Sequence, residues 1–210
     1  MNKKQRILKI IELLDRQYPA ARTALKFRNP LEMLISTILS AQCTDAMVNI
    51  VTKELFKKYK TPEDYANVKV EELENDIRST GFYKTKAKNI KAACKIIVEK
   101  FNSKVPGTMD ELLTLPGVAR KTANIVLWNS YGIISGIAVD THVKRLSGLL
   151  GLTKNKDQDK IEKDLMEITP EKEWAQITNL LIEHGRNACI ARHPKCEICV
   201  LNTLCPSSRV

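Results

Sequence analysis

Residues 115–127 read LPGVARKTANIVL and join a proline-glycine turn to an amphipathic run with helical spacing. Gly117 allows backbone angles that larger residues avoid, and the turn exposes the first backbone N–H groups of the following helix. Such N–H groups form a binding site for phosphate. Arg120 and Lys121 lie where the positive end of the helix dipole disfavours cations. They are therefore either ordinary surface charges at a common helix-to-helix turn or neighbours of a bound anion.

Helical spacing of apolar residues continues through nearly the whole chain, which predicts an all-α fold. Residues 86–101, KAKNIKAACKIIVEKF, place apolar side chains on one face, and their five lysines, Lys86 included, are expected mostly around the remaining, solvated surface. Residues 29–42, NPLEMLISTILSAQ, are apolar around most of the circumference, which is typical of a buried helix. Further helices are expected at about residues 3–15, 45–59, 71–79, 121–131, 141–150, 158–168 and 172–185.

Length and charge limit the class of protein. The 210 residues suffice for one large domain or two modest ones. Lys and Arg number 34 against 24 Asp and Glu, and the net charge of +10 favours an anionic partner such as nucleic acid without singling it out. No secretion signal and no stretch with the apolar length of a membrane span is recognisable. We therefore expect a cytoplasmic protein with thiolate ligands or buried thiols rather than disulfides.

Four of the six cysteines crowd the C-terminus in CIARHPKCEICVLNTLC, with the spacing C-x6-C-x2-C-x5-C. This pattern predicts one tetrathiolate site formed by Cys189, Cys196, Cys199 and Cys205. Zinc and a [4Fe-4S] cluster both accept four thiolates, so the residues alone leave the metal open. The first interval carries Arg192, His193 and Lys195, a basic loop suited to contact with a DNA backbone. The remaining cysteines, Cys43 and Cys94, are expected to be inert buried thiols.

Together with VDTHV at residues 139–143, the 115–127 stretch resembles the helix-hairpin-helix of the DNA base-excision glycosylases, and of their endonuclease III branch in particular. The resemblance implies that the hairpin backbone grips DNA phosphates, that Lys121 is the catalytic amine and that Asp140 is its partner. Taken alone, Asp140 is also a good N-cap for the helix that follows it. The chain has Ala119 where the family usually has a second glycine. The DNA contacts expected at the hairpin and the cysteine loop are Leu115, Gly117, Ala119, Arg120, Arg192 and Lys195.

The chemistry fits these residue types. Cleavage of an N-glycosidic bond develops positive charge on the sugar, which a carboxylate stabilises. A neutral lysine amine can attack C1′ and form a Schiff base, which acidifies the C2′ proton and permits β-elimination of the 3′ phosphate. We expect burial, the adjacent Arg120 and the helix N-terminus to favour the neutral amine of Lys121. Asp140 opposes this effect, so it is better interpreted as a proton acceptor and charge stabiliser.

An enzyme that acts at C1′ must take the nucleotide out of the stack and fill the vacancy. The family uses residues of two loops for this purpose. The matching residues are Gln42 in LSAQCTD and Phe82 in TGFYKTKA, where a leucine is common. Phe82 could instead be an ordinary core residue.

The resemblance covers nearly the whole chain and implies two helical domains with a DNA groove between them. Residues 23–132 would form a six-helix domain that contains the helix-hairpin-helix. Residues 1–22 and 133–210 would form a second domain, and the cysteine spacing there implies a [4Fe-4S] cluster.

The function implied is that of a bifunctional DNA glycosylase and abasic-site lyase that removes oxidised pyrimidines such as thymine glycol. The expected partner is double-stranded DNA with damaged bases or abasic sites, and we expect a monomer that does not bind membranes. Adenine-specific and mismatch-specific glycosylases are alternatives, disfavoured because Ile38 stands at about the adenine branch's carboxylate position and Lys121 is present. A non-catalytic DNA-binding module is a third alternative.

Overall fold

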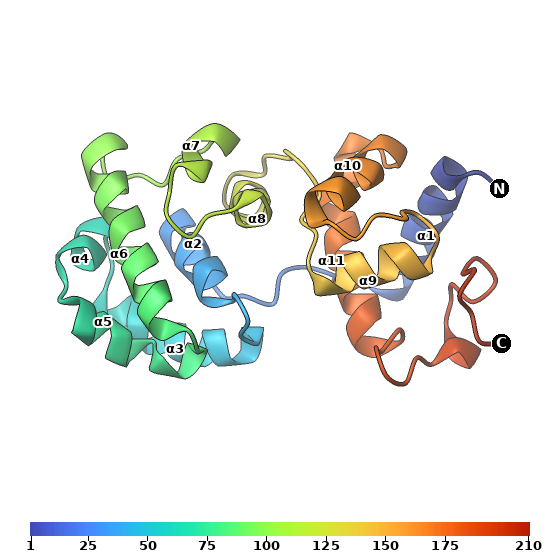
Figure 1. Cartoon of the computed structure of the whole chain (residues 1–210), viewed down its shortest axis with the longest axis horizontal. Coiled ribbons are helices and arrows are strands. Elements are labelled where there is room, and N and C mark those ends of the chain that lie inside the picture. The colour runs from blue at the N-terminus through green and yellow to red at the C-terminus, as the bar shows by residue number, and fades with distance from the viewer. The chain divides into compact units, whose positions relative to one another are not determined.

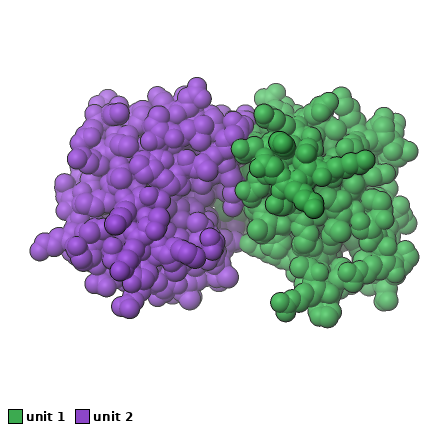
Figure 2. Space-filling model, in the orientation of Figure 1, with its two compact units in different colours: residues 1–23, 136–210 green, residues 24–135 purple.

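The computed structural model of the chain describes all residues, 1–210, and is built from helices and loops without a β-strand, which confirms the all-α prediction (Figure 1). The chain divides into two compact units, one formed by Ala24–Ser135 and the other by Met1–Thr23 with Gly136–Val210 (Figure 2). No helix is long and apolar enough to cross a membrane.

The unit of residues 24–135 has one hydrophobic core. The buried helix α2 (Pro30–Leu39) packs against α8 (Arg120–Tyr131), and the long helix α6 (Tyr83–Lys100) packs against α4 (Pro62–Asn67). Every residue from Leu31 to Leu39 is buried, as its apolar circumference predicts. The other elements of this unit are α3 (Asp45–Lys58), α5 (Val70–Asp76), η1 (Arg78–Thr80) and α7 (Met109–Leu113).

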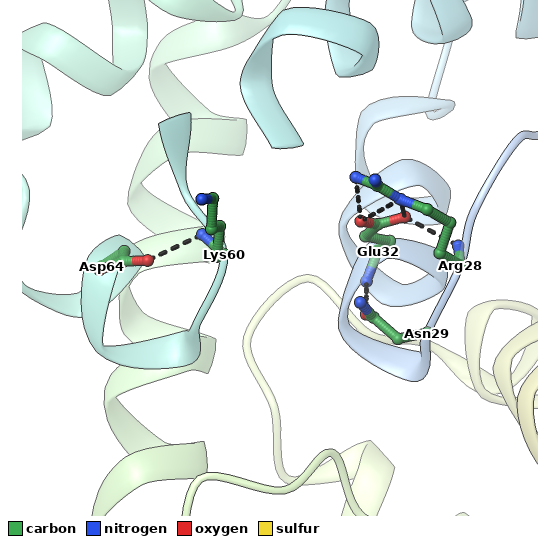
Figure 3. Close-up of polar contacts among 5 residues, drawn as sticks. All are labelled: Arg28, Asn29, Glu32, Lys60 and Asp64. Carbon is green, nitrogen blue, oxygen red and sulfur yellow. Dashed lines mark hydrogen bonds and ion pairs between the residues drawn. The ribbon is translucent and has the colours of Figure 1, made fainter. Parts of the chain in front are cut away.

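Side-chain caps fix where two of these helices begin (Figure 3). At the start of α2 the Asn29 side chain accepts a hydrogen bond of 2.9 Å from the backbone N–H of Glu32. The buried Glu32 carboxylate is paired with the guanidinium of Arg28 at 2.9 Å. At the start of α4 the Asp64 carboxylate accepts a bond of 2.7 Å from the backbone N–H of Lys60. The Asn29 acceptor satisfies an N–H group that the helix leaves unpaired, and the Asp64 acceptor holds the residue before the N-cap of α4.

The unit of residues 1–23 and 136–210 has a second core. Helix α11 (Trp174–Asn187) contacts both α1 (Lys3–Gln17) and α9 (Thr141–Leu149), so the N-terminal helix is built into the C-terminal part of the chain. The apolar stripe of α1, Ile7, Ile10 and Leu14, is fully buried. The remaining elements are α10 (Gln158–Ile168), η2 (Glu171–Glu173) and η3 (Cys196–Ile198).

One expectation for α6 is wrong. Lys86 was expected on the solvated side of the helix, but only 4% of it is exposed. Lys86 lies four residues before Ile90 and eight before Cys94, both of which are fully buried. Residues at this spacing share one helix face, so the position belongs to the core. Cys94 is buried as expected, and burial raises the pKa of its thiol to about 12.

Candidate functional site

The hairpin that joins α7 to α8 is a tight turn with a left-handed glycine. Gly117 has φ +82°, and the backbone N–H of Val118 donates to the carbonyl of Leu115 at 3.1 Å. Leu115 and Val118 are buried and anchor the turn in the core. A Cβ atom added at Gly117 would lie 3.0 Å from Cβ and Nδ2 of Asn89 on α6. The backbone angle therefore favours glycine here, and a Cβ atom would also force the Asn89 side chain to give way by a few tenths of an ångström.

The first turn of α8 has no side-chain cap. Its N-cap is Ala119, whose side chain offers no acceptor to the exposed N–H groups of the helix. Arg120 and Lys121 are the first two residues of the helix. Lys121 is exposed in the structure, which contains no DNA, so the expected burial of this side chain is wrong. The turn thus combines exposed N–H groups with two cationic side chains at one helix N-terminus.

Asp140, in the other unit, is the N-cap of α9. Its Oδ1 accepts a bond of 2.8 Å from the backbone N–H of Val143, and the residue is half-buried. The cap uses one carboxylate oxygen. The N-cap alternative for Asp140 is therefore correct, and the cap fixes the direction of the carboxylate.

Two side chains from distant helices hold the extended segment that leads into Asp140. Nε2 of Gln158 on α10 donates to the carbonyl of Val139 at 3.0 Å. Oγ1 of Thr178 on α11 donates to the carbonyl of Ala138 at 3.2 Å. The two partners of each contact are 19 and 40 residues apart in the sequence, so no local sequence pattern predicts these contacts.

The two loops expected to take part in base displacement each contain a left-handed residue. Gln42 has φ +52° and is exposed. Phe82 has φ +49° and is 64% exposed, so it is not a core residue. Both loops belong to the unit of residues 24–135. The sequence did not identify Lys86, whose ammonium group contacts the base of each loop.

The four C-terminal cysteines line one cavity of about 210 Å³. All four carry free thiols. No three His, Cys, Asp or Glu side chains lie close enough together to hold a single metal ion. Leu201 is fully buried and anchors the cysteine segment in the core of its unit. Four free thiols that line one cavity are a donor set that fits an iron-sulfur cluster.

Hydrogen-bond donors approach these sulfur atoms. The Arg145 guanidinium lies 3.6 Å from Sγ of Cys189, and the backbone N–H of Leu201 donates to Sγ of Cys199 at 3.4 Å. Burial raises the pKa of Cys199 and also that of Cys205. Donors of this kind offset that effect, because they stabilise thiolate.

A buried histidine lies beside the cysteines. Burial, with Arg145 nearby, lowers the pKa of His184 to about 4, so its ring is neutral at physiological pH. Its Nδ1 lies 3.2 Å from the hydroxyl of Tyr18, and its Nε2 lies 3.4 Å from Sγ of Cys199. With its proton on Nε2, the ring accepts from Tyr18 and donates to the sulfur.

The loop between the first two of these cysteines is basic and exposed. Arg192, His193 and Lys195 are all exposed, as the sequence predicts for Arg192 and Lys195. The backbone N–H of Lys195 donates to the carbonyl of Ala188 at 2.9 Å and closes the loop. This hydrogen bond holds the ends of the loop together, and its basic side chains lie on the surface.

Comparison with known proteins gives consistent matches. The family model of the HhH-GPD superfamily base excision DNA repair proteins matches residues 35–171. The iron-sulfur binding domain of endonuclease III matches residues 189–205. Endonuclease III of Synechocystis is 51% identical over 208 residues, which is 99% of this chain and 95% of that protein.

Two solved structures have closely similar folds. One is a non-covalent endonuclease III–DNA complex, which has a TM-score of 0.94 and 47% identity and covers 99% of this chain and 97% of its own. The other is a trapped endonuclease III–DNA covalent intermediate with an estranged adenine, with the same TM-score and identity. It covers 99% of this chain and 98% of its own.

Proposed function

The chain belongs to the endonuclease III family within the HhH-GPD superfamily of base-excision DNA repair proteins, and on this premise we propose a bifunctional enzyme. Family membership makes it a base-excision repair DNA glycosylase. The proposal is that it also cleaves abasic sites, and that its substrates are oxidised pyrimidines of the thymine glycol type. The observation that carries it is Lys121, an exposed amine in the first turn of the uncapped helix α8. Similarity to a trapped covalent complex supports an enzyme that becomes bonded to its substrate.

In the proposed mechanism the neutral amine of Lys121 attacks C1′ of the damaged nucleotide. The N-glycosidic bond breaks, and the base leaves with the bonding electron pair and takes up a proton. The amine gives up one proton as it attacks, and the sugar ring then opens: the C1′–O4′ bond breaks, O4′ takes up a proton, and Lys121 remains joined to C1′ as a protonated Schiff base. Removal of the acidified C2′ proton then expels the 3′ phosphate and cuts the strand. Water finally releases Lys121 from the sugar fragment.

Asp140 is proposed to accept the proton of the attacking amine and to stabilise positive charge on the sugar. The N-terminus of α9 supports the second of these roles, because a helix N-terminus favours a negative charge beside it. The cap with Val143 uses Oδ1, so we assign the proton transfer to Oδ2. Gln158 and Thr178 hold the segment before Asp140 and thereby orient it.

DNA binding is proposed at three features. The hairpin around Leu115, Gly117 and Ala119 offers backbone N–H groups to a phosphate, with Arg120 beside it. Gln42 and Phe82 are exposed tips that would enter the duplex when the nucleotide is extruded. The cysteine loop offers Arg192 and Lys195 to the backbone, which fits the net charge of +10. Phe82 would act as an apolar wedge between bases.

The cysteine cavity is proposed to hold a [4Fe-4S] cluster. A single zinc ion holds its sulfur ligands at about 2.3 Å and needs no cavity among them. The four thiols share a cavity of about 210 Å³ with other side chains, and this space has room for a larger group. The bound cluster would cross-link the C-terminal segment and keep the basic loop in shape. Four iron atoms and four acid-labile sulfides per purified chain would agree with this cluster, and one zinc ion would contradict it.

The test of the proposed function separates its two steps. Wild-type protein should release the base from a thymine-glycol duplex and cut the strand at the same rate under single-turnover conditions. Lys121→Gln should lose both activities by about 10³-fold or more, since one amine performs both steps. Base release without strand cleavage by the wild-type protein would indicate a monofunctional glycosylase instead. Tight binding without either product would indicate a non-catalytic module.

The structure offers nothing in favour of the adenine-specific alternative. Ile38, at about the position of that branch's carboxylate, is 4% exposed and belongs to the core of its unit. We propose that the enzyme acts as a cytoplasmic monomer on double-stranded DNA with damaged bases or abasic sites.

A further inference from the structure

The buried lysine of α6 is an unusual core residue. Lys86 is the fourth residue of the helix and is 4% exposed, and no carboxylate is paired with it. Burying an ammonium group costs free energy unless hydrogen bonds replace its contacts with water. Its partners therefore indicate what the buried charge is for.

Those partners are two backbone carbonyl oxygens from different segments. Nζ of Lys86 donates to the carbonyl of Leu39 at 2.8 Å and to the carbonyl of Thr80 at 2.8 Å. Because both oxygens lie 2.8 Å from one nitrogen, they are at most twice that distance apart. One ammonium group thus joins the C-terminal end of α2 to the C-terminal end of η1.

Each of these carbonyls lies at the base of a loop with an exposed tip. Leu39 precedes Gln42 by three residues, and Thr80 precedes Phe82 by two. Both tips have left-handed backbone angles, φ +52° and +49°, and both are exposed. A non-glycine residue in this conformation persists only where its surroundings hold it.

We propose that Lys86 is a positioning residue whose single ammonium group sets the spacing between the Gln42 and Phe82 loops, so that both tips reach the same opened base pair in DNA. The proposal rests on the proposed function, in which these tips enter the duplex. Lys86 does not touch the reacting atoms. It acts through the two loops, and misplacement of either tip by a fraction of their spacing weakens opening of the duplex.

The same helix supplies a matched control. Nζ of Lys91 also donates to two backbone carbonyls, those of Ala66 at 2.5 Å and Val68 at 2.6 Å. These carbonyls lie at the C-terminal end of α4 and are not part of either loop. Lys91→Met removes the same kind of bonds from the same helix, so it measures the loss of stability without the loss of spacing.

The experiment measures duplex opening independently of chemistry. Wild-type, Lys86→Met and Lys91→Met proteins are titrated against a duplex with 2-aminopurine opposite a tetrahydrofuran abasic analogue, well below their melting temperatures. We expect the fluorescence rise of Lys86→Met to require about tenfold more protein, and that of Lys91→Met to stay within about twofold of wild type. Equal titrations for the two variants would overturn the proposal.

A double-mutant cycle separates positioning from general weakening of the fold. If Lys86 acts through the tips, Lys86→Met should add no more than about a twofold effect in a protein that already carries Gln42→Ala and Phe82→Ala. A full additional tenfold loss in that background would contradict the proposal. If Lys86→Met does not fold, Lys86→Arg decides, because its guanidinium keeps the charge but carries its donor nitrogens on a longer, planar group that changes the spacing of the two carbonyls. Opening by Lys86→Arg at the wild-type level would also overturn the proposal.

Failure of the proposed function and failure of the proposed role of Lys86 give different results in these experiments. If the wild-type protein opens the duplex but neither releases the base nor cuts the strand, the proposed chemistry is contradicted and the role of Lys86 is unaffected. If the wild-type protein carries out both steps but Lys86→Met and Lys91→Met open the duplex equally well, the role of Lys86 is contradicted and the proposed chemistry is unaffected.

Discussion

At the scale of single residues, Asp140 combines two roles that substitution can separate. It caps α9 through Oδ1, and we propose that its negative charge serves the chemistry. Asparagine is as good an N-cap as aspartate but carries no charge. The two roles therefore predict different effects for two substitutions.

The free energy of unfolding of Asp140→Asn should lie within about 0.5 kcal/mol of the wild-type value, because the amide oxygen retains the cap. Its single-turnover rate on a thymine-glycol duplex should fall by about 10²–10³-fold, since the carboxylate is lost. Asp140→Ala should lose the same activity and also about 1 kcal/mol of unfolding free energy. Thermal melts and rate measurements on both variants check this, and full activity in Asp140→Asn would contradict the catalytic role.

Individual residues differ in how well the sequence predicts them. Lys121, Asp140 and the four cysteines were named from spacing and resemblance, and their catalytic and ligand roles stay predictions. The exposure of Phe82 could not be predicted from its apolar side chain, which is typical of a core residue; in the structure Phe82 is the left-handed N-cap of α6 and is 64% exposed. Lys86 was misplaced, although its spacing to Ile90 and Cys94 already put it on the core face.

At the scale of elements, the hairpin between α7 and α8 depends on one backbone angle and one contact below it. Gly117 has φ +82°, and a Cβ atom added there would lie 3.0 Å from the Asn89 side chain, closer than an ordinary contact. Gly132 has φ +67° at the end of α8, but no atom lies within 4 Å of an added Cβ. Substitution of Gly132 therefore adds backbone strain alone, whereas substitution of Gly117 adds backbone strain and also displaces the turn.

Gly132→Ala should lower the free energy of unfolding by about 1–2 kcal/mol through the left-handed angle. Gly117→Ala should cost more, up to about 3 kcal/mol, because Asn89 must also move. Only Gly117→Ala should weaken binding to an abasic-analogue duplex, by about tenfold or more, which fluorescence anisotropy measures. Equal affinity of the two variants would argue against phosphate binding by the hairpin.

The elements follow from local patterns where they are long. The predicted helices at residues 3–15 and 158–168 agree with α1 and α10 to within two residues. The six-residue helix α4 was not predicted, because so short a segment shows no clear period. The predicted helix at 71–79 is instead α5 followed by the separate turn η1, and no local signal marked that break.

For the whole molecule, the effect of the net charge of +10 on DNA binding depends on where the cationic side chains lie. Arg192 and Lys195 are exposed in a loop whose ends are tied to the cysteine cavity. A fixed cation replaces counterions at a phosphate, and the release of those counterions makes binding salt-dependent.

Arg192→Ala and Lys195→Ala should each weaken binding to any duplex sequence and reduce the slope of log K against log salt by about one. Lys172→Ala is a control, since Lys172 is exposed and belongs to no proposed DNA contact. Its slope should match that of wild type. An unchanged slope in both loop variants would show that the cysteine loop does not contact phosphates.

In the proposed mechanism, Lys121 bonds covalently to C1′ of the damaged nucleotide. Borohydride reduction during reaction with a thymine-glycol duplex, followed by mass spectrometry of the digested protein, detects this bond. We expect one sugar-modified peptide, with the modification on Lys121, and no adduct with Lys121→Gln. An adduct on a different lysine, or none from a protein that releases the base, would contradict it.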